Sequence, residues 1–173
     1  MNELRAVTRP VSAHSTLKPA VKLLIPIDGS ERARWGLHYA RARARRGEEL
    51  SVDLLFVAEP IQNWQVLRFW SRRQVAGFQS ERGHFLLDDA ERYLRDAGIP
   101  VQSHFCEGDA AYQILDAAQT LHSQEIVLPE HEGGWIYRLD RNIAKEIQGR
   151  LPPVRLVVVD ENGLPCAAPV RCQ

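Results

Sequence analysis

The fold is decided by Val21-Lys22-Leu23-Leu24-Ile25-Pro26-Ile27-Asp28-Gly29-Ser30, an apolar run that stops abruptly at a carboxylate, a glycine and a hydroxyl. A short run of branched apolar residues closed by turn-forming residues predicts a buried strand. Ser30 is placed to accept backbone N–H groups as a helix N-cap, and apolar residues then recur at helical spacing through residues 33–44. This strand-turn-helix unit puts Asp28 at the carboxyl end of a strand, where open α/β sheets bind ligands.

The same alternation continues along the chain. Apolar runs predict further strands at residues 50–57, 101–106, 125–128 and 154–159, and helical spacing predicts helices between them. Alternating strands and helices form a parallel sheet with helices on both faces, so the predicted fold class is α/β in three α/β/α layers. Pro26 opposes this prediction, because proline has no N–H to donate to a sheet and normally occupies edge strands. Because Pro26 lies beside the end of the strand, only one hydrogen bond of the sheet is lost. We expect one domain over residues 21–160, a flexible arm over 1–20 and a tail over 161–173.

Composition excludes several classes of protein. The 173 residues are 45% apolar, which suits a single compact domain, and 22 lysines and arginines balance 22 aspartates and glutamates. No net field therefore draws the chain to nucleic acid or to a membrane. Residues 1–20 lack the apolar region of a signal peptide. Three cysteines without a C-x-x-C pair argue against a disulfide framework and a zinc site, and reduced thiols fit a cytoplasmic protein.

No catalytic constellation emerges from the motifs. Ser30 lacks the G-x-S-x-G elbow of a nucleophilic serine. Cys106 is followed by carboxylates, which raise a thiol pKa and suppress the thiolate. His104, Asp109 and the acidic residues after 128 could approach one another, but they lack the i, i+4 spacing of a helical metal site, and we interpret them as solvated loop residues. We predict neither an enzyme nor a metal site.

Three segments together point to a family. Residues 23–30, the Gly108-Asp109-Ala110 stretch, and Ile126-Val127-Leu128 before a glycine-bearing loop resemble the universal stress proteins, over about residues 21–160. The resemblance implies an adenine nucleotide alpha hydrolase-like fold with a five-stranded parallel sheet in the order 3-2-1-4-5. In nucleotide-binding members, positions matched here by Asp28 and Val57 hold the adenosine part of ATP. The triphosphate of those members lies on a loop after the fourth strand with the pattern Gly-x2-Gly-x9-Gly-Ser/Thr.

The loop after residue 128 departs from that pattern. Pro129 and Glu132 fall on the first two glycines, and Arg141 and Asn142 fall on the closing pair. A phosphate loop needs glycines because its backbone must approach the phosphate oxygens closely. Pro129 supplies no N–H, and a carboxylate a few ångströms from a phosphate repels it by about 1 kcal/mol even in water. We therefore expect no cofactor, with ATP held by a rebuilt loop as the alternative. The residues of the remnant pocket would be Asp28, Val57, Gly133 and Asn142.

The leading hypothesis is a universal stress protein-like regulatory protein of the stress response that acts without catalysis. It would work through homodimerisation and protein contacts. Many members of the family pair through the last strand, and an apolar edge strand would otherwise leave backbone groups exposed. The candidate dimer interface is therefore Val154, Leu156 and Val158.

The aromatic segment over residues 61–83, in which no clean periodicity is found, is the candidate site for an unknown protein partner. Trp64, Phe69 and Trp70 lie there among arginines, a mixture typical of interface centres, and burial of these rings over the sheet is the alternative. Two hypotheses of other classes remain open. One is an ATP-binding sensor or weak ATPase that uses Asp28. The other is a redox-responsive module that acts through Cys166 and Cys172 in the tail.

Overall fold

A single parallel sheet organises the protein. The computed structural model describes residues 20–59, 72–130 and 154–166. Its strands lie in the order β3-β2-β1-β4-β5, and every neighbouring pair is parallel. This arrangement confirms the predicted α/β class and the strand order that the resemblance implied. The strands are β1 (Val21–Pro26), β2 (Leu50–Ala58), β3 (Val101–Glu107), β4 (Glu125–Pro129) and β5 (Arg155–Val159).

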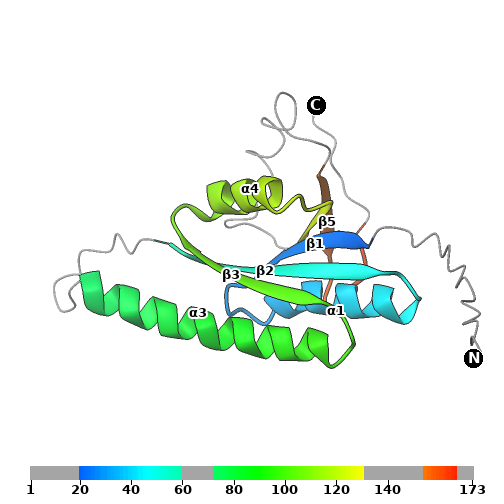
Figure 1. Ribbon diagram of the computed structural model, residues 1–173, viewed down its shortest axis with the longest axis horizontal. Helices are drawn as coiled ribbons and strands as arrows, with labels where there is room; N and C mark the ends of the chain where they lie inside the picture. The colour runs from blue at the N-terminus through cyan, green and yellow to red at the C-terminus, as the bar shows by residue number, and fades with distance from the viewer. Residues whose placement is uncertain (1–19, 60–71, 131–153, 167–173) are drawn as a thin grey trace, which may run out of the picture.

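Helices cover both faces of the sheet (Figure 1). The helices α1 (Ala33–Arg45) and α3 (Arg72–Arg95) lie against one face, and α4 (Ala110–Thr120) lies against the other. Successive side chains of a strand point to opposite faces, so β1 contributes to both cores. Leu23 and Ile25 pack in the cluster under α1 and α3, whereas Leu24 packs in the cluster under α4. All three side chains are at most 1% exposed.

β1 is central in the sheet, although it contains Pro26. It pairs with β2 on one side and with β4 on the other. Pro26 is the last residue of the strand and lies in register with Leu55. The next N–H group, that of Ile27, donates to the Leu55 carbonyl at 2.8 Å. The missing donor therefore interrupts the sheet only at its rim, which is why a proline is tolerated here.

Two helix starts differ from the sequence interpretation. α1 begins at Ala33 with Arg32 as its N-cap residue, so the predicted cap at Ser30 was wrong by two positions. The Ser30 hydroxyl still accepts the Ala33 N–H at 3.2 Å, because a turn over residues 30–32 precedes the helix. α3 begins at Arg72 and so extends into the segment 61–83, where no periodicity was found.

β5 forms one edge of the sheet, as expected for the last strand. Its predicted interface residues Val154, Leu156 and Val158 are half-buried. Residues 160–166, which include the first part of the tail predicted over 161–173, turn back beside the strand. We call them the return segment.

Several predictions fall outside the described residues. These are most of the arm at 1–20, the aromatic residues Trp64, Phe69 and Trp70, the loop residues Gly133 and Asn142, and Cys172. Within the part of the chain that the structure describes, no helix combines the length and apolar character needed to cross a membrane.

Candidate functional site

A pocket of about 210 Å³ opens at the carboxyl ends of β1 and β2. Asp28 and Val57, the two described residues of the predicted pocket, both line it, so the fold brings them together. Ligand pockets for drug-sized molecules usually hold about 300–1,000 Å³, so this one is small. Its walls are otherwise mainly apolar, with one further carboxylate. The other lining residues are Pro26, Ile27, Leu55, Glu59, Ala110 and Ile114.

The Asp28 carboxylate shapes the turn that follows β1. Its Oδ1 atom accepts the backbone N–H of Ser30 at 2.9 Å, and the Ser30 hydroxyl in turn accepts the N–H of Ala33 at 3.2 Å. This is an Asx-type turn, in which a short carboxylate satisfies a donor two residues later. Asp28 therefore has a structural role in the strand-to-helix turn.

Two carboxylates occupy the amino terminus of α4. Asp109 has an extended backbone, with φ −70° and ψ 124°, and its Oδ1 atom accepts the Tyr112 N–H at 3.1 Å. Glu59, which follows β2, reaches across so that its Oε1 atom lies 3.4 Å from the Ala110 backbone nitrogen as an acceptor. The first N–H groups of a helix lack partners within the helix and readily bind anions. Here the protein's own carboxylates already accept two of them.

Glu59 was not among the site residues predicted from the sequence. The available signal was its position two residues beyond Val57, at the carboxyl end of a strand whose neighbour leads into α4. In a parallel sheet those ends share one rim, so a carboxylate there can reach the next helix terminus.

At the end of β4, Pro129 and Glu130, the last described residues before the loop, leave no free backbone N–H for an anion. Pro129 is the last residue of the strand, in register with Val159, and has no N–H. The following N–H, that of Glu130, donates to the Val159 carbonyl at 2.7 Å. The Glu130 carboxylate is contacted by the thiol of Cys166, with 3.4 Å between Oε2 and Sγ.

A buried carboxylate elsewhere in the sheet is paired with two partly exposed side chains. Asp53 on β2 is 1% exposed, and its Oδ1 atom lies 2.9 Å from Nε2 of His104 on β3. Its Oδ2 atom lies 3.1 Å from the Lys22 ammonium, an ion-pair contact whose angle is not that of a hydrogen bond. His104 is therefore a partner of a buried carboxylate, and its interpretation as a solvated loop residue was wrong.

Cys106 is not set up as a nucleophile. Burial raises the pKa of its thiol, and the charge of Asp116 raises it further. A thiol with a raised pKa carries little thiolate at neutral pH. Its side chain packs against the cluster under α4.

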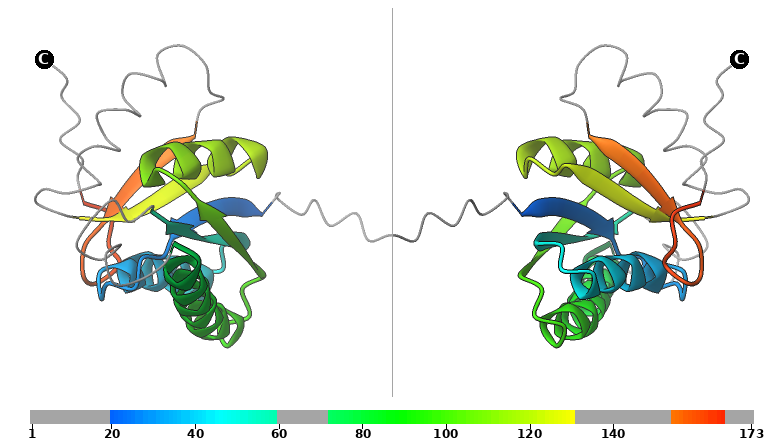
Figure 2. Two further views of the ribbon diagram at one scale, coloured as in Figure 1. Left: turned by 90° about the vertical axis from the view of Figure 1, so that its left-hand side faces the viewer. Right: turned by 90° about the vertical axis from the view of Figure 1, so that its right-hand side faces the viewer.

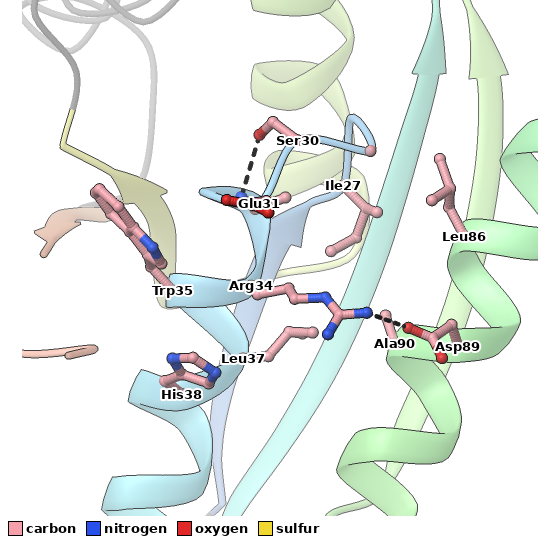
Figure 3. Close-up of a pocket in the computed structure, with 12 residues that line it drawn as sticks. Ile27, Ser30, Glu31, Arg34, Trp35, Leu37, His38, Leu86, Asp89 and Ala90 are labelled. Atoms are coloured by element: carbon pink, nitrogen blue, oxygen red, sulfur yellow. Dashed lines mark hydrogen bonds and ion pairs between the residues drawn. The ribbon is translucent and has the colours of Figure 1, made fainter. Parts of the chain in front are cut away.

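A second pocket, of about 490 Å³, lies between α1 and α3 (Figure 3). Ile27, Leu37 and Leu86 contribute apolar surface, and Arg34 on α1 reaches Asp89 on α3 with 2.9 Å between Nη2 and Oδ2. The side chains of the pair are 64% and 48% exposed. Such a pair contributes about 0–1 kcal/mol and does not by itself select a ligand.

The fold matches that of several solved proteins. A universal stress protein family structure from Burkholderia pseudomallei aligns with a TM-score of 0.62 and 18% identity, covering 80% of this chain and 94% of that one. The universal stress protein UspA from Lactobacillus plantarum aligns with a TM-score of 0.58 and 15% identity, covering 80% and 97%. A universal stress protein family structure from Arabidopsis thaliana with AMP bound aligns with a TM-score of 0.59 and 11% identity, covering 81% and 91%.

The chain therefore has the fold of the universal stress proteins. No protein-family model matches its sequence, and no curated protein matches it at a significant level.

Proposed function

We propose that this protein is a regulatory member of the universal stress protein family that acts without catalysis and does not hold ATP in the family's manner. The shared fold supports the family, and the position of Asp28 and Val57 in one pocket supports a nucleotide site as its origin. What sets this chain apart is the charge and the hydrogen bonding around that pocket.

The main support for this proposal is the pair of carboxylates at the amino terminus of α4. A phosphate group near this helix would meet Glu59 and Asp109 where it needs N–H donors. Two like charges about 4 Å apart repel by about 1 kcal/mol in water and by more in a cleft. The site therefore favours neutral or cationic groups over a polyanion.

The rim at β4 supports the same conclusion. Pro129 offers no N–H, and the N–H of Glu130 is bonded to Val159. A loop starting here lacks the first donors that a phosphate-binding turn would supply, and Glu130 adds another negative charge.

The absence of catalysis is supported by the state of the candidate nucleophiles. The hydroxyl of Ser30 is engaged with the Ala33 N–H, and the Cys106 thiol has a raised pKa. The Cys166 thiol also has a raised pKa, because of partial burial and its hydrogen bond to Glu130. A raised pKa slows oxidation, which weighs against the redox hypothesis. The free thiols of Cys106 and Cys166 fit the proposed cytoplasmic location.

Protein contacts are the proposed mode of action. We propose that a homodimer forms through β5, the last strand of the sheet, with Leu156 and Val158 on the strand and Val154 directly before it, once its outer edge is free. Trp64, Phe69 and Trp70 remain the proposed contacts for another protein partner.

A nucleotide sensor is the second candidate. It is favoured by the pocket that joins Asp28 and Val57, and by the Arabidopsis thaliana relative in fold that has AMP bound. An adenosine moiety with few or no phosphates would avoid most of the repulsion from Glu59 and Asp109.

Calorimetric titration of the purified protein with magnesium and ATP tests the proposal, together with analysis of any nucleotide that copurifies. We expect no saturable heat from ATP and no copurified ATP. Micromolar binding that disappears in Asp28→Ala would overturn the proposal and favour the sensor. Glu81→Gln, which removes an exposed carboxylate on α3, is the control for a general change in charge.

A further inference from the structure

The return segment folds back along the outer edge of β5. The Cys166 N–H donates to the Val158 carbonyl at 2.8 Å, and Val159 forms an antiparallel bridge with Pro165. Figure 2 shows the chain leaving β5 and turning beside α1. In the described part of the chain, β4 is the sheet neighbour of β5 on one side, so the return segment occupies the opposite side.

A turn centred on Asp160 fixes this path. The Asp160 N–H donates to the Leu164 carbonyl at 3.0 Å, and Oδ1 of Asp160 accepts the N–H groups of Asn162 at 2.9 Å and Leu164 at 2.8 Å. One carboxylate oxygen thus holds two successive parts of the turn, as Asx turns do.

Gly163 locks the segment against α1. It is buried, with a φ of +69°, and an added Cβ would lie 2.5 Å from the Tyr39 nitrogen and 2.8 Å from the His38 carbonyl carbon. These are backbone atoms of a helix, which cannot move aside cheaply. The ring nitrogen Nδ1 of His38 also lies 3.4 Å from the Glu161 carbonyl oxygen. The contact depends on a residue without a side chain.

The edge beneath the segment is suited to a second copy of the chain. Val158 directs its carbonyl outward, and by the strand period of two the backbone groups of Leu156 and Val154 face the same way. An antiparallel pair of two β5 strands centred on Leu156 would set Val154 opposite Val158 of the other copy. All cross-strand pairs on that face would be apolar, which favours pairing.

Both partners need the same backbone group. The carbonyl of Val158 cannot accept Cys166 and at the same time pair fully with another strand. We propose that the return segment and a second copy of this chain compete for the outer edge of β5. With the segment docked the chain is a monomer, and with the segment displaced β5 pairs with β5. This inference rests on the proposed use of β5 as the dimer edge and is independent of the proposal about nucleotides.

Gly163→Ala in the whole chain tests the competition, with Gly98→Ala as the matched control. Gly98 has a φ of +73°, and no atom of the described residues lies within 4 Å of an added Cβ, so it carries the backbone strain without the clash. Hydrogen exchange by mass spectrometry reports on the Cys166 amide, and analytical ultracentrifugation reports on the oligomeric state. Asp160→Ala, which removes the two turn hydrogen bonds, is the second variant.

We expect a protected Cys166 amide and a monomer in the wild type and in Gly98→Ala. Gly163→Ala and Asp160→Ala should lose this protection and raise dimer association by about tenfold or more, the order expected from a forced core clash. A wild-type dimer that keeps the amide protected would overturn the competition while leaving the dimer proposal intact. Variants that lose protection and stay monomeric would overturn both. Protection that persists in both variants would contradict the locking roles of Gly163 and Asp160.

Discussion

Replacing Lys22 should lower the free energy of unfolding more than replacing other partly exposed charged residues, because Lys22 pairs with the buried carboxylate of Asp53. Asp53 is 1% exposed and lies 3.1 Å from the Lys22 ammonium, whose side chain is 32% exposed. Lys22→Met keeps the length of the aliphatic stem and removes the charge. Removing one partner of a buried ion pair typically costs about 3–5 kcal/mol, because the other charge stays buried. His104 remains 2.9 Å from Asp53 and offsets part of this loss. We expect the free energy of unfolding to fall by about 2–4 kcal/mol.

Equilibrium unfolding in urea at neutral pH measures this free energy, and an unchanged slope would show that compactness is preserved. Arg34→Met is the matched control, since Arg34 and Asp89 are 64% and 48% exposed and their pair should contribute only about 0–1 kcal/mol. The double variant Lys22→Met/Asp53→Leu should regain stability relative to Lys22→Met, because a buried pair replaced by apolar groups is often neutral. A cost for Lys22→Met no larger than that of Arg34→Met would refute this reasoning.

Four other outcomes follow from local geometry and from burial. Asp109→Ala should lower Tm by about 2–4 °C through loss of an N-cap of about 1 kcal/mol, whereas Asp109→Asn should retain most of the cap, as thermal unfolding by circular dichroism can show. Gly83→Ala should destabilise by about 1–3 kcal/mol, because the added Cβ would lie 2.7 Å from the Phe56 ring. For Gly77→Ala in the same helix, no atom of the described residues lies within 4 Å of the new Cβ, and the variant should be more stable by up to about 1 kcal/mol in the same urea assay. The pKa of Cys106 is raised in the folded state, so the thiol ionises at lower pH in the unfolded state. The free energy of unfolding should therefore fall as the pH rises through the range in which thiols ionise. Urea unfolding at a series of pH values should show a smaller fall for Cys106→Ala than for the wild type.

The sheet was predictable because its strands are short apolar runs bounded by turn residues. β2 to β5 each start and end within one residue of the predicted runs, and β1 starts at Val21, the first residue of its predicted run. Pro26 opposed the assignment of β1 to a central strand, because proline is normally confined to edge strands. The assignment from the alternation of strands and helices was correct, because the proline is the last residue of the strand.

The start of α3 was not predictable from periodicity. Its inward face includes Gly83, which contributes no apolar side chain to the pattern, while Phe78 and Phe85 are 59% and 73% exposed. Large apolar residues on the solvent-exposed face of the helix and a glycine on its buried face obscure the helical period of the hydrophobic pattern.

The site was predictable only in part for a similar reason. Asp28 and Val57 could be inferred because strand ends of a parallel sheet meet at one rim. Glu59 acts on a helix that starts 51 residues later, and the return segment depends on contact between Gly163 and α1. Such contacts are set by tertiary packing and leave no local signature in the sequence.

The proposed function depends on the exclusion of phosphate from the pocket by the chain's own carboxylates, and a single calorimetric series measures this exclusion. Adenosine, AMP and ATP with magnesium are titrated into the wild type and into Glu59→Gln. Added phosphates should not tighten binding to the wild type, and Glu59→Gln should shift the preference toward the phosphorylated ligands. Affinity that increases from adenosine to AMP to ATP in the wild type would contradict it.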